Sequence, residues 1–115
     1  MTGYDIFDRV CGLLGCHDLI GHKESGKCTV FLNMLNQICA DLGIRTIENL
    51  SQKIIIKEAQ TEALIYGSAM LFSVTLRDAA CAKIYTELYN SKRAKALSKT
   101  DVRQDILPSP SLGGM

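Results

Sequence analysis

Apolar residues recur at helical spacing through residues 28–42 more regularly than anywhere else in the chain. Seven residues follow the pattern: Cys28, Phe31, Leu32, Leu35, Ile38, Cys39 and Leu42. Steps of three and four residues place these side chains on one face of an α-helix. We predict a helix that opens at Ser25 or Gly26 and ends at Gly43. The stretch therefore limits the chain to folds that bury one face of a long helix.

A helix is also expected at residues 3–14. Thr2 is a candidate N-cap, and Asp5 three residues later gives an acidic variant of the capping box. The apolar residues of this segment share one face: Phe7, Val10, Cys11 and Leu14. Gly15 suits the left-handed position that closes a helix.

Two further helices are predicted, at residues 58–76 and 79–97. The first has apolar residues on more than one face, which predicts burial on several sides and suits contacts between subunits. A short break at Asp78, a good N-cap residue, separates the two helices. The last helix is expected to turn five residues toward the core: Cys81, Ile84, Tyr85, Leu88 and Tyr89. The apolar stripe then fails, so residues 92–99 are predicted to project past the core.

The connection at residues 44–57 has no clear periodicity. Ile44, Ile47 and Leu50 are spaced to hold a turn against the core. Residues 54–56 are three isoleucines, which fit either a short strand or an extended apolar plug. An isolated strand is not stable, so a strand here would need a partner, expected on another subunit.

At 115 residues the chain has the length of one domain. We predict an all-α fold, a small bundle of about four helices over residues 1–103 with an extended C-terminal tail over residues 104–115. The tail residues expected to dock on another component are two prolines and three aliphatic residues: Ile106, Leu107, Pro108, Pro110 and Leu112. Proline favours extended backbone, and a pre-extended peptide loses less entropy on docking. The alternative is a terminal segment without a docking role.

Positive charge is concentrated late in the chain, although the net charge is only +1. Residues 1–76 carry six Lys/Arg and eight Asp/Glu, whereas residues 77–103 carry seven Lys/Arg and three acids. Four cations form the candidate contact with DNA phosphates or an acidic partner: Lys92, Arg93, Lys95 and Lys99. The alternative is a solvated helix end, where cations suit the negative end of the helix dipole.

Cysteine and histidine residues gather in the first quarter of the chain: Cys11, Cys16, His17, His22 and Cys28. Zinc sites use paired ligands such as C-x-x-C, and no such pair occurs. Cys11 and Cys28 lie on apolar helix faces, so packing explains them better. There is also no phosphate-binding glycine motif. We expect no metal, no cofactor and no enzymatic activity.

The five cysteines are expected to be reduced thiols in a protein made in the cytoplasm. The first ten residues lack the apolar core of a secretory signal. The longest apolar runs are far shorter than a membrane span, so no membrane contact is expected.

Several short motifs follow one another in a particular order. They are L-L-G at residues 13–15, F-L-N with D-L-G at 31–43, E-A-L-x-Y-G-x-A-x-L at 62–71, Y-x-x-L-Y-N-x-K-R-A at 85–94 and I-L-P with G-G at 106–114. In this order the chain resembles the small head–tail connector proteins (adaptor or neck proteins) of tailed bacteriophages. The resemblance covers most of the chain and contains no catalytic motif. Residues 16–26 depart from it, because CHDLIGH stands where a plainer polar linker is expected.

The resemblance implies a structural protein of the virion. Such subunits form a homo-oligomeric ring, commonly twelve-fold, beneath the portal protein. The ring joins the head to the next neck or tail component, of the stopper or tail-terminator type, and packaged DNA passes through it. The C-terminal segment reaches onto the portal or a neighbouring subunit. The protein would be assembled in the host cytoplasm and lie at the neck of the virion.

Two other interpretations remain open. One is a small cytoplasmic helical regulatory module that binds a protein or nucleic-acid partner through its basic last helix. It predicts a monomer or dimer, with steeply salt-dependent binding if the partner is DNA. The other is a Cys/His enzyme or metal protein, which predicts stoichiometric zinc.

Overall fold

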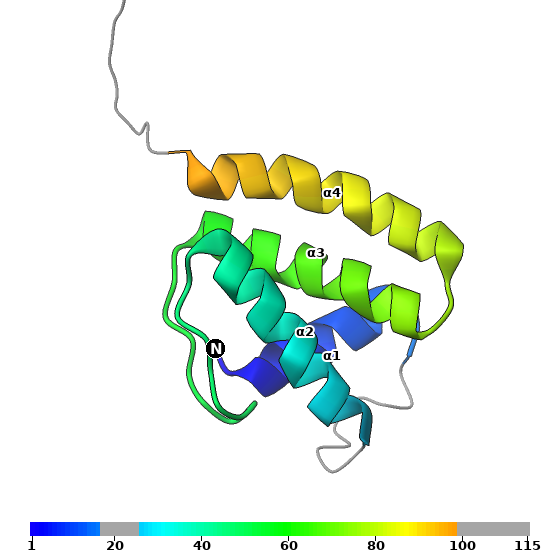
Figure 1. Cartoon of the computed structure of the whole chain (residues 1–115), viewed down its shortest axis with the longest axis horizontal. Coiled ribbons are helices and arrows are strands. Elements are labelled where there is room, and N and C mark those ends of the chain that lie inside the picture. Colours follow the sequence, from blue (N-terminus) through cyan, green and yellow to red (C-terminus); the bar gives the residue numbers. More distant parts are fainter. Residues whose placement is uncertain (17–25, 99–115) are drawn as a thin grey trace, which may run out of the picture.

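The computed structural model describes residues 1–16 and 26–98. Within these ranges the chain forms four α-helices and no strand (Figure 1). The helices are α1 (Gly3–Leu14), α2 (Gly26–Leu42), α3 (Glu58–Thr75) and α4 (Ala79–Leu97). The predicted all-α class and four-helix bundle are confirmed, and each described helix end lies within one residue of its expected position. The expected tail, residues 104–115, lies outside the described residues.

The capping box predicted for α1 is confirmed. The Thr2 hydroxyl accepts a hydrogen bond from the Asp5 N–H at 3.2 Å, and the Asp5 carboxylate accepts one from the Thr2 N–H at 2.8 Å. Gly15 closes the helix with a φ of 76°, a left-handed conformation that glycine adopts without strain. Both ends of α1 are therefore determined by local sequence.

Three phenylalanine rings join α1, α2 and α3 at the centre of the core. The Phe7 and Phe31 centroids lie 5.0 Å apart, and Phe72 lies 5.9 and 5.6 Å from them. All three pairs meet edge to face, the arrangement that aromatic rings favour. Burial of each ring stabilises the fold by roughly 1.5–3 kcal/mol.

Helix α3 is the central element of the bundle. Figure 1 shows it between α4 on one side and α1 and α2 on the other. Its buried residues are Ala63, Leu64, Ile65, Gly67, Ser68, Ala69, Phe72 and Ser73. The predicted burial on several sides is confirmed, but the chain itself supplies it. The broad apolar coverage of α3 therefore does not indicate contacts between subunits.

The predicted inner face of α4 is confirmed in part. Tyr89 is buried, and Cys81 and Tyr85 are half-buried. Ile84 and Leu88 were also expected to face inward, but they are 54% and 36% exposed. Small residues on α3 explain the difference, because they leave room for aromatic rings. A Cβ added to Gly67 would lie only 2.8 Å from the Tyr89 ring, and Tyr85 stacks on Tyr66 with centroids 6.0 Å apart.

The connection between α2 and α3 is extended but forms no strand. Its one bridge is antiparallel, between Lys53 and Thr2 of the same chain. The Ile54 N–H donates to the Met1 carbonyl at 2.8 Å, and Ile54 is buried. Ile55 points outward and is 89% exposed. Residues 54–56 are therefore the extended apolar alternative and not a strand, and the contacts on this side of the connection come from the N-terminal residues of the same chain.

Candidate functional site

Two of the predicted contact cations are already paired within the molecule. Lys92 Nζ lies 3.0 Å from the Glu62 carboxylate, on α3. Arg93 donates two hydrogen bonds to the carboxylate of Asp41, at the end of α2: from Nε to Oδ2 at 2.7 Å and from Nη2 to Oδ1 at 3.3 Å. The last turns of α4 thus lie against the bundle, with Ala96 packed on the core. The prediction that this segment projects past the core is wrong for residues 92–98.

The Tyr89 hydroxyl also donates to the Asp41 carboxylate, beside Arg93. Hydrogen bonds from Arg93 and Tyr89 lower the pKa of Asp41 below its ordinary value. Burial and the adjacent carboxylate raise the pKa of Tyr89 well above its ordinary value. Asp41 keeps 43% of its side-chain surface exposed, so solvent weakens the pair with Arg93. This cluster fixes α4 on α2.

Two hollows open at the end of the bundle where α2 ends, α3 begins and α4 ends. The first, here called the loop hollow, has a volume of about 430 Å³ and is lined by Gly43, Ile44, Arg45, Thr46, Ile47, Gln52, Lys53, Ile54, Ile55, Ile56 and Gln60. The second, the helix-end hollow, has a volume of about 520 Å³ and is lined by Leu42, Lys57, Ala59, Gln60, Lys95, Ala96, Leu97 and Ser98. Because Gln60 lines both, the two hollows adjoin. We call them together the basic groove.

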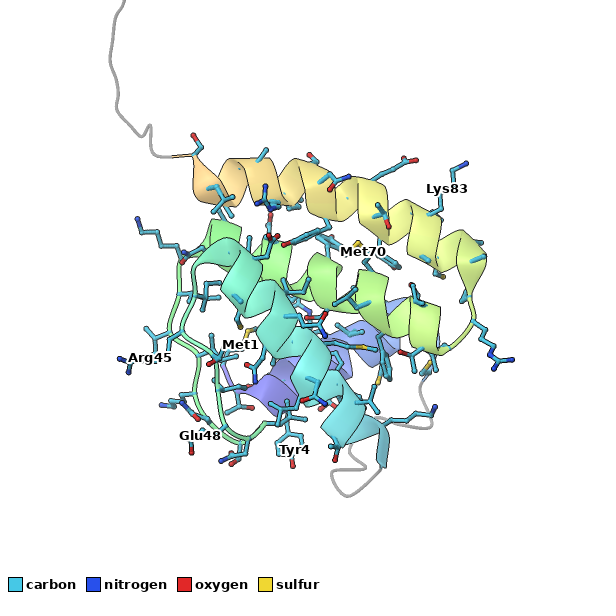
Figure 2. All side chains as sticks on the ribbon, viewed as in Figure 1. Met1, Tyr4, Arg45, Glu48, Met70 and Lys83 are labelled. Carbon is cyan, nitrogen blue, oxygen red and sulfur yellow. The ribbon has the colours of Figure 1, made fainter. Side chains whose placement is uncertain are left out.

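Four cations line the basic groove. Arg45 and Lys53 belong to the loop hollow, and Lys57 and Lys95 to the helix-end hollow. No aspartate or glutamate of the described residues lines either hollow. Figure 2 shows Arg45 pointing away from the bundle on the side of the connection. The fold thus gathers positive charge from both halves of the chain.

Of these four cations, only Lys95 was predicted from the sequence. Arg45, Lys53 and Lys57 lie within residues 1–76, where the net charge is negative, far in sequence from the last helix. Their position depends on how the connection returns along the bundle. The spacing of Ile44, Ile47 and Leu50 correctly predicted that the connection packs on the core, but it did not predict which cations meet there.

Hydrogen bonds from the bundle hold the connection in place. The Asn36 side chain, on α2, donates to the Ile47 carbonyl at 2.7 Å and accepts from the Ile47 N–H at 2.9 Å. At the start of α3, the Gln60 side chain accepts from the Lys57 N–H at 3.1 Å. The loop hollow is therefore bounded by backbone that is anchored at both ends.

The floor of the loop hollow offers both apolar surface and free backbone donors. Ile44 and Ile56 are half-buried, and Ile55 is almost fully exposed. Within the described part of the chain, the N–H groups of Ile55 and Ile56 have no hydrogen-bond partner. Cationic side chains and exposed aliphatic surface together suit a peptide with acidic and aliphatic residues.

Three of the five cysteines lie in the core of the bundle. Cys11, Cys28 and Cys39 are buried, and burial raises the pKa of Cys39 to about 11, which disfavours its thiolate. No three His, Cys, Asp or Glu residues within 1–16 and 26–98 are placed to hold a metal ion. His17 and His22 lie outside those ranges. In the same ranges, no helix combines the length and apolar character needed to cross a membrane.

The predicted docking residues of the tail lie outside the described residues; they are Ile106, Leu107, Pro108, Pro110 and Leu112. Lys99 lies outside them as well. Comparison of the chain with protein-family models, with curated proteins and with solved structures found no match. The chain is thus defined by its class, an all-α four-helix bundle with a basic groove at one end.

Proposed function

We propose that this protein is a structural, non-enzymatic subunit of a bacteriophage neck. In this role, copies of the chain form a ring beneath the portal protein and join the head to the next tail component. Twelve copies are the expected number. The proposal rests on the order of motifs that resembles head–tail connectors, together with the apolar surface that the folded chain leaves uncovered.

The observation that carries the proposal is the presence of two separate uncovered apolar surfaces. Ile84 and Leu88 lie on the outward face of α4, and Ile55 lies on the connection between α2 and α3. In Figure 1 the first turns of α4 and this connection are at opposite ends of the bundle. A ring built by head-to-tail contact requires two different patches on each subunit, one for each neighbour. In this proposal, Ile84 and Leu88 contact one neighbour and Ile55 contacts the other.

The C-terminal tail supplies attachment in this proposal. Ile106, Leu107 and Leu112 dock on the portal or a neighbouring subunit, and Pro108 and Pro110 keep the peptide extended. A ring presents many copies of a weak contact at once, which multiplies the overall strength of the joint. Packaged DNA passes through the ring, and the subunits are assembled in the host cytoplasm before they become part of the virion neck.

The test is to mix the protein with its portal and measure the mass of the complex by native mass spectrometry, with imaging by negative stain. Full-length protein is expected to add a ring of copies to the portal. A variant that lacks residues 104–115 is expected to stay folded and to lose attachment. Failure of the full-length protein to bind the portal at micromolar concentration would contradict the proposal, and attachment of the truncated variant would contradict the role of the tail.

A regulatory module that acts through the basic last helix is less well supported. Lys92 and Arg93, two of its four predicted contact residues, are paired with Glu62 and Asp41. A partner anion would have to displace these carboxylates before it reached them. Strongly salt-dependent DNA binding by the isolated protein would favour this function over the neck role.

A further inference from the structure

The outward face of α4 carries exposed residues whose order suits contact with an identical face. In sequence order they are Ala80, Lys83, Ile84, Glu87, Leu88 and Ser91, and all six are exposed. We propose that this face binds the same face of a second copy, so that the two α4 helices pack antiparallel about a two-fold axis. This inference concerns the free subunit, goes beyond the neck role and does not depend on it.

Helix α4 is placed to make this contact. It lies along the edge of the bundle and has α3 on one side only (Figure 1). Tyr85, Tyr89 and Arg93 make its printed contacts with α3, α1 and α2. Figure 2 shows Lys83 pointing away from the bundle. The described part of the chain therefore leaves the outward face of α4 uncovered.

The apolar residues of this face match themselves in an antiparallel pair. Ile84 is 54% exposed and Leu88 is 36% exposed, and the midpoint between them is residue 86. With the two-fold axis near this point, Ile84 of each copy meets Leu88 of the other, because every contact across such an axis occurs twice. Ala80 and Ser91 have nearly the same midpoint and come opposite each other. Their small side chains allow the two helices to approach closely.

The charged residues have the same symmetry. Lys83 and Glu87 lie beside Ile84 and Leu88, and their midpoint is residue 85. Within the described residues, neither of the two forms a salt bridge. Antiparallel pairing brings Lys83 of each copy opposite Glu87 of the other, whereas parallel pairing would bring like charges together. Charges beside an apolar seam select the direction of helix pairing in this way.

The ends of the contact add little to it. There Lys95 of one copy comes near the start of α4 in the other, where the charges of Arg77 and Asp78 offset each other. A contact between single helices buries less than the about 1,200 Å² of a standard interface. We therefore expect a weak dimer, with a dissociation constant above about 1 µM.

The consequence is that the free subunit covers its own exposed aliphatic residues. Ile84 and Leu88 are removed from water in the dimer and are exposed again when it dissociates. Any other partner that uses this face, a ring neighbour included, has to displace the second copy first. The apparent affinity of such a partner falls by the fraction of subunits that are paired.

The direct test is sedimentation equilibrium of the full-length protein between about 1 µM and 1 mM. The mass is expected to rise from that of a monomer to that of a dimer and no further. Ile84→Ser should weaken the dimer at least about tenfold, because two isoleucines lose their contacts. Ile55→Ser removes a more exposed isoleucine outside α4 and is the matched control, expected to have no effect. A monomer at every concentration, species larger than a dimer, or equal effects of the two variants would overturn the proposal.

A charge exchange between two proteins tests the antiparallel direction. Lys83→Glu and Glu87→Lys should each weaken the dimer, because each places like charges opposite each other. An equimolar mixture of the two variants should form a one-to-one dimer, since two glutamates then face two lysines. Arg45→Glu makes the same charge change away from α4 and should leave the dimer intact. Failure of the mixture to pair would overturn the proposal, whereas the neck role is judged separately by attachment to the portal.

Discussion

The Tyr89 hydroxyl donates a hydrogen bond to the Asp41 carboxylate, and this contact joins α4 to α2 across the bundle. The two residues are 48 positions apart in sequence. Arg93 reaches the same carboxylate from the next turn of α4. Gly67 makes the contact possible, because a side chain at that position of α3 would occupy the space of the Tyr89 ring.

The first prediction concerns the strength of this contact. Tyr89→Phe should lower the free energy of unfolding by about 0.5–1.5 kcal/mol, the usual net value of a hydrogen bond. Combining it with Asp41→Asn in a double-mutant cycle should show coupling, because the two side chains act together. Urea unfolding measures both quantities. Tyr66→Phe is the control, since within the described residues no hydrogen bond involves the Tyr66 hydroxyl; an equal loss in that variant would contradict the assignment.

The second prediction is the pH dependence of this cluster. The pKa of Asp41 is lower in the folded protein than in the unfolded chain, so its stabilisation is present at neutral pH and is lost in acid, below about pH 4. The pKa of Tyr89 is raised on folding, so its stabilisation is present at neutral pH and is lost above about pH 10. Melting temperatures measured across pH should show both losses. Asp41→Asn should reduce the acid loss, and Tyr89→Phe the alkaline loss.

The third prediction compares two glycines of α1. A Cβ at Gly3 would lie 2.8–2.9 Å from Leu50, including its backbone, whereas a Cβ at Gly12 would meet nothing within 4 Å. Gly3→Ala should therefore destabilise the protein by about 1–3 kcal/mol through overpacking. Gly12→Ala should stabilise it by about 0.5–1 kcal/mol, because alanine is the better helix former. Chemical denaturation gives both values, and the same sign for the two variants would refute the close approach of α1 to the connection.

The fourth prediction tests the anchor of the connection. Asn36→Asp removes the donor to the Ile47 carbonyl and places a negative charge beside it. We expect a loss of about 1–3 kcal/mol and faster amide exchange at Ile47. Asn33→Asp makes the same chemical change at an exposed position of the same helix and should have little effect. Unaltered exchange at Ile47 in Asn36→Asp would show that the connection is held by other contacts.

Much of the fold could be predicted because its signals are local. Each of these helix ends is determined by residues close to it in sequence. The capping residues act as predicted: Thr2 with Asp5, Gly15, Gly43 and Asp78. The face of α4 was predicted correctly for Cys81, Tyr85 and Tyr89, but not for Ile84 and Leu88. Ile84 and Leu88 are as apolar as the buried Tyr89, and small residues on α3 decide which of them faces inward.

The candidate site was predicted only in part for a similar reason. Three of the predicted cations lie close together in sequence but have different surroundings. Lys92 pairs with Glu62 of α3 and Arg93 pairs with Asp41 of α2, whereas Lys95 lines the helix-end hollow. Arg45 and Lys53 line the hollow next to that of Lys95 because the connection returns along the bundle, where Asn36 and the N-terminal residues hold it. Contacts of this kind join residues that are tens of positions apart, so no periodic pattern in the sequence indicates them.

The small residues of α3 also determine how this protein can change during evolution. A Cβ at Gly67 would lie 2.8 Å from Ile38 and from Tyr89, and Ser68 and Ala69 are fully buried, so larger side chains at these positions would disturb the packing of the bundle. Packing of the bundle places no such restriction on the outward face of α4 or on the tip of the connection. Proteins that share this bundle should therefore keep small residues at these positions of α3, whatever contacts their outer surfaces make.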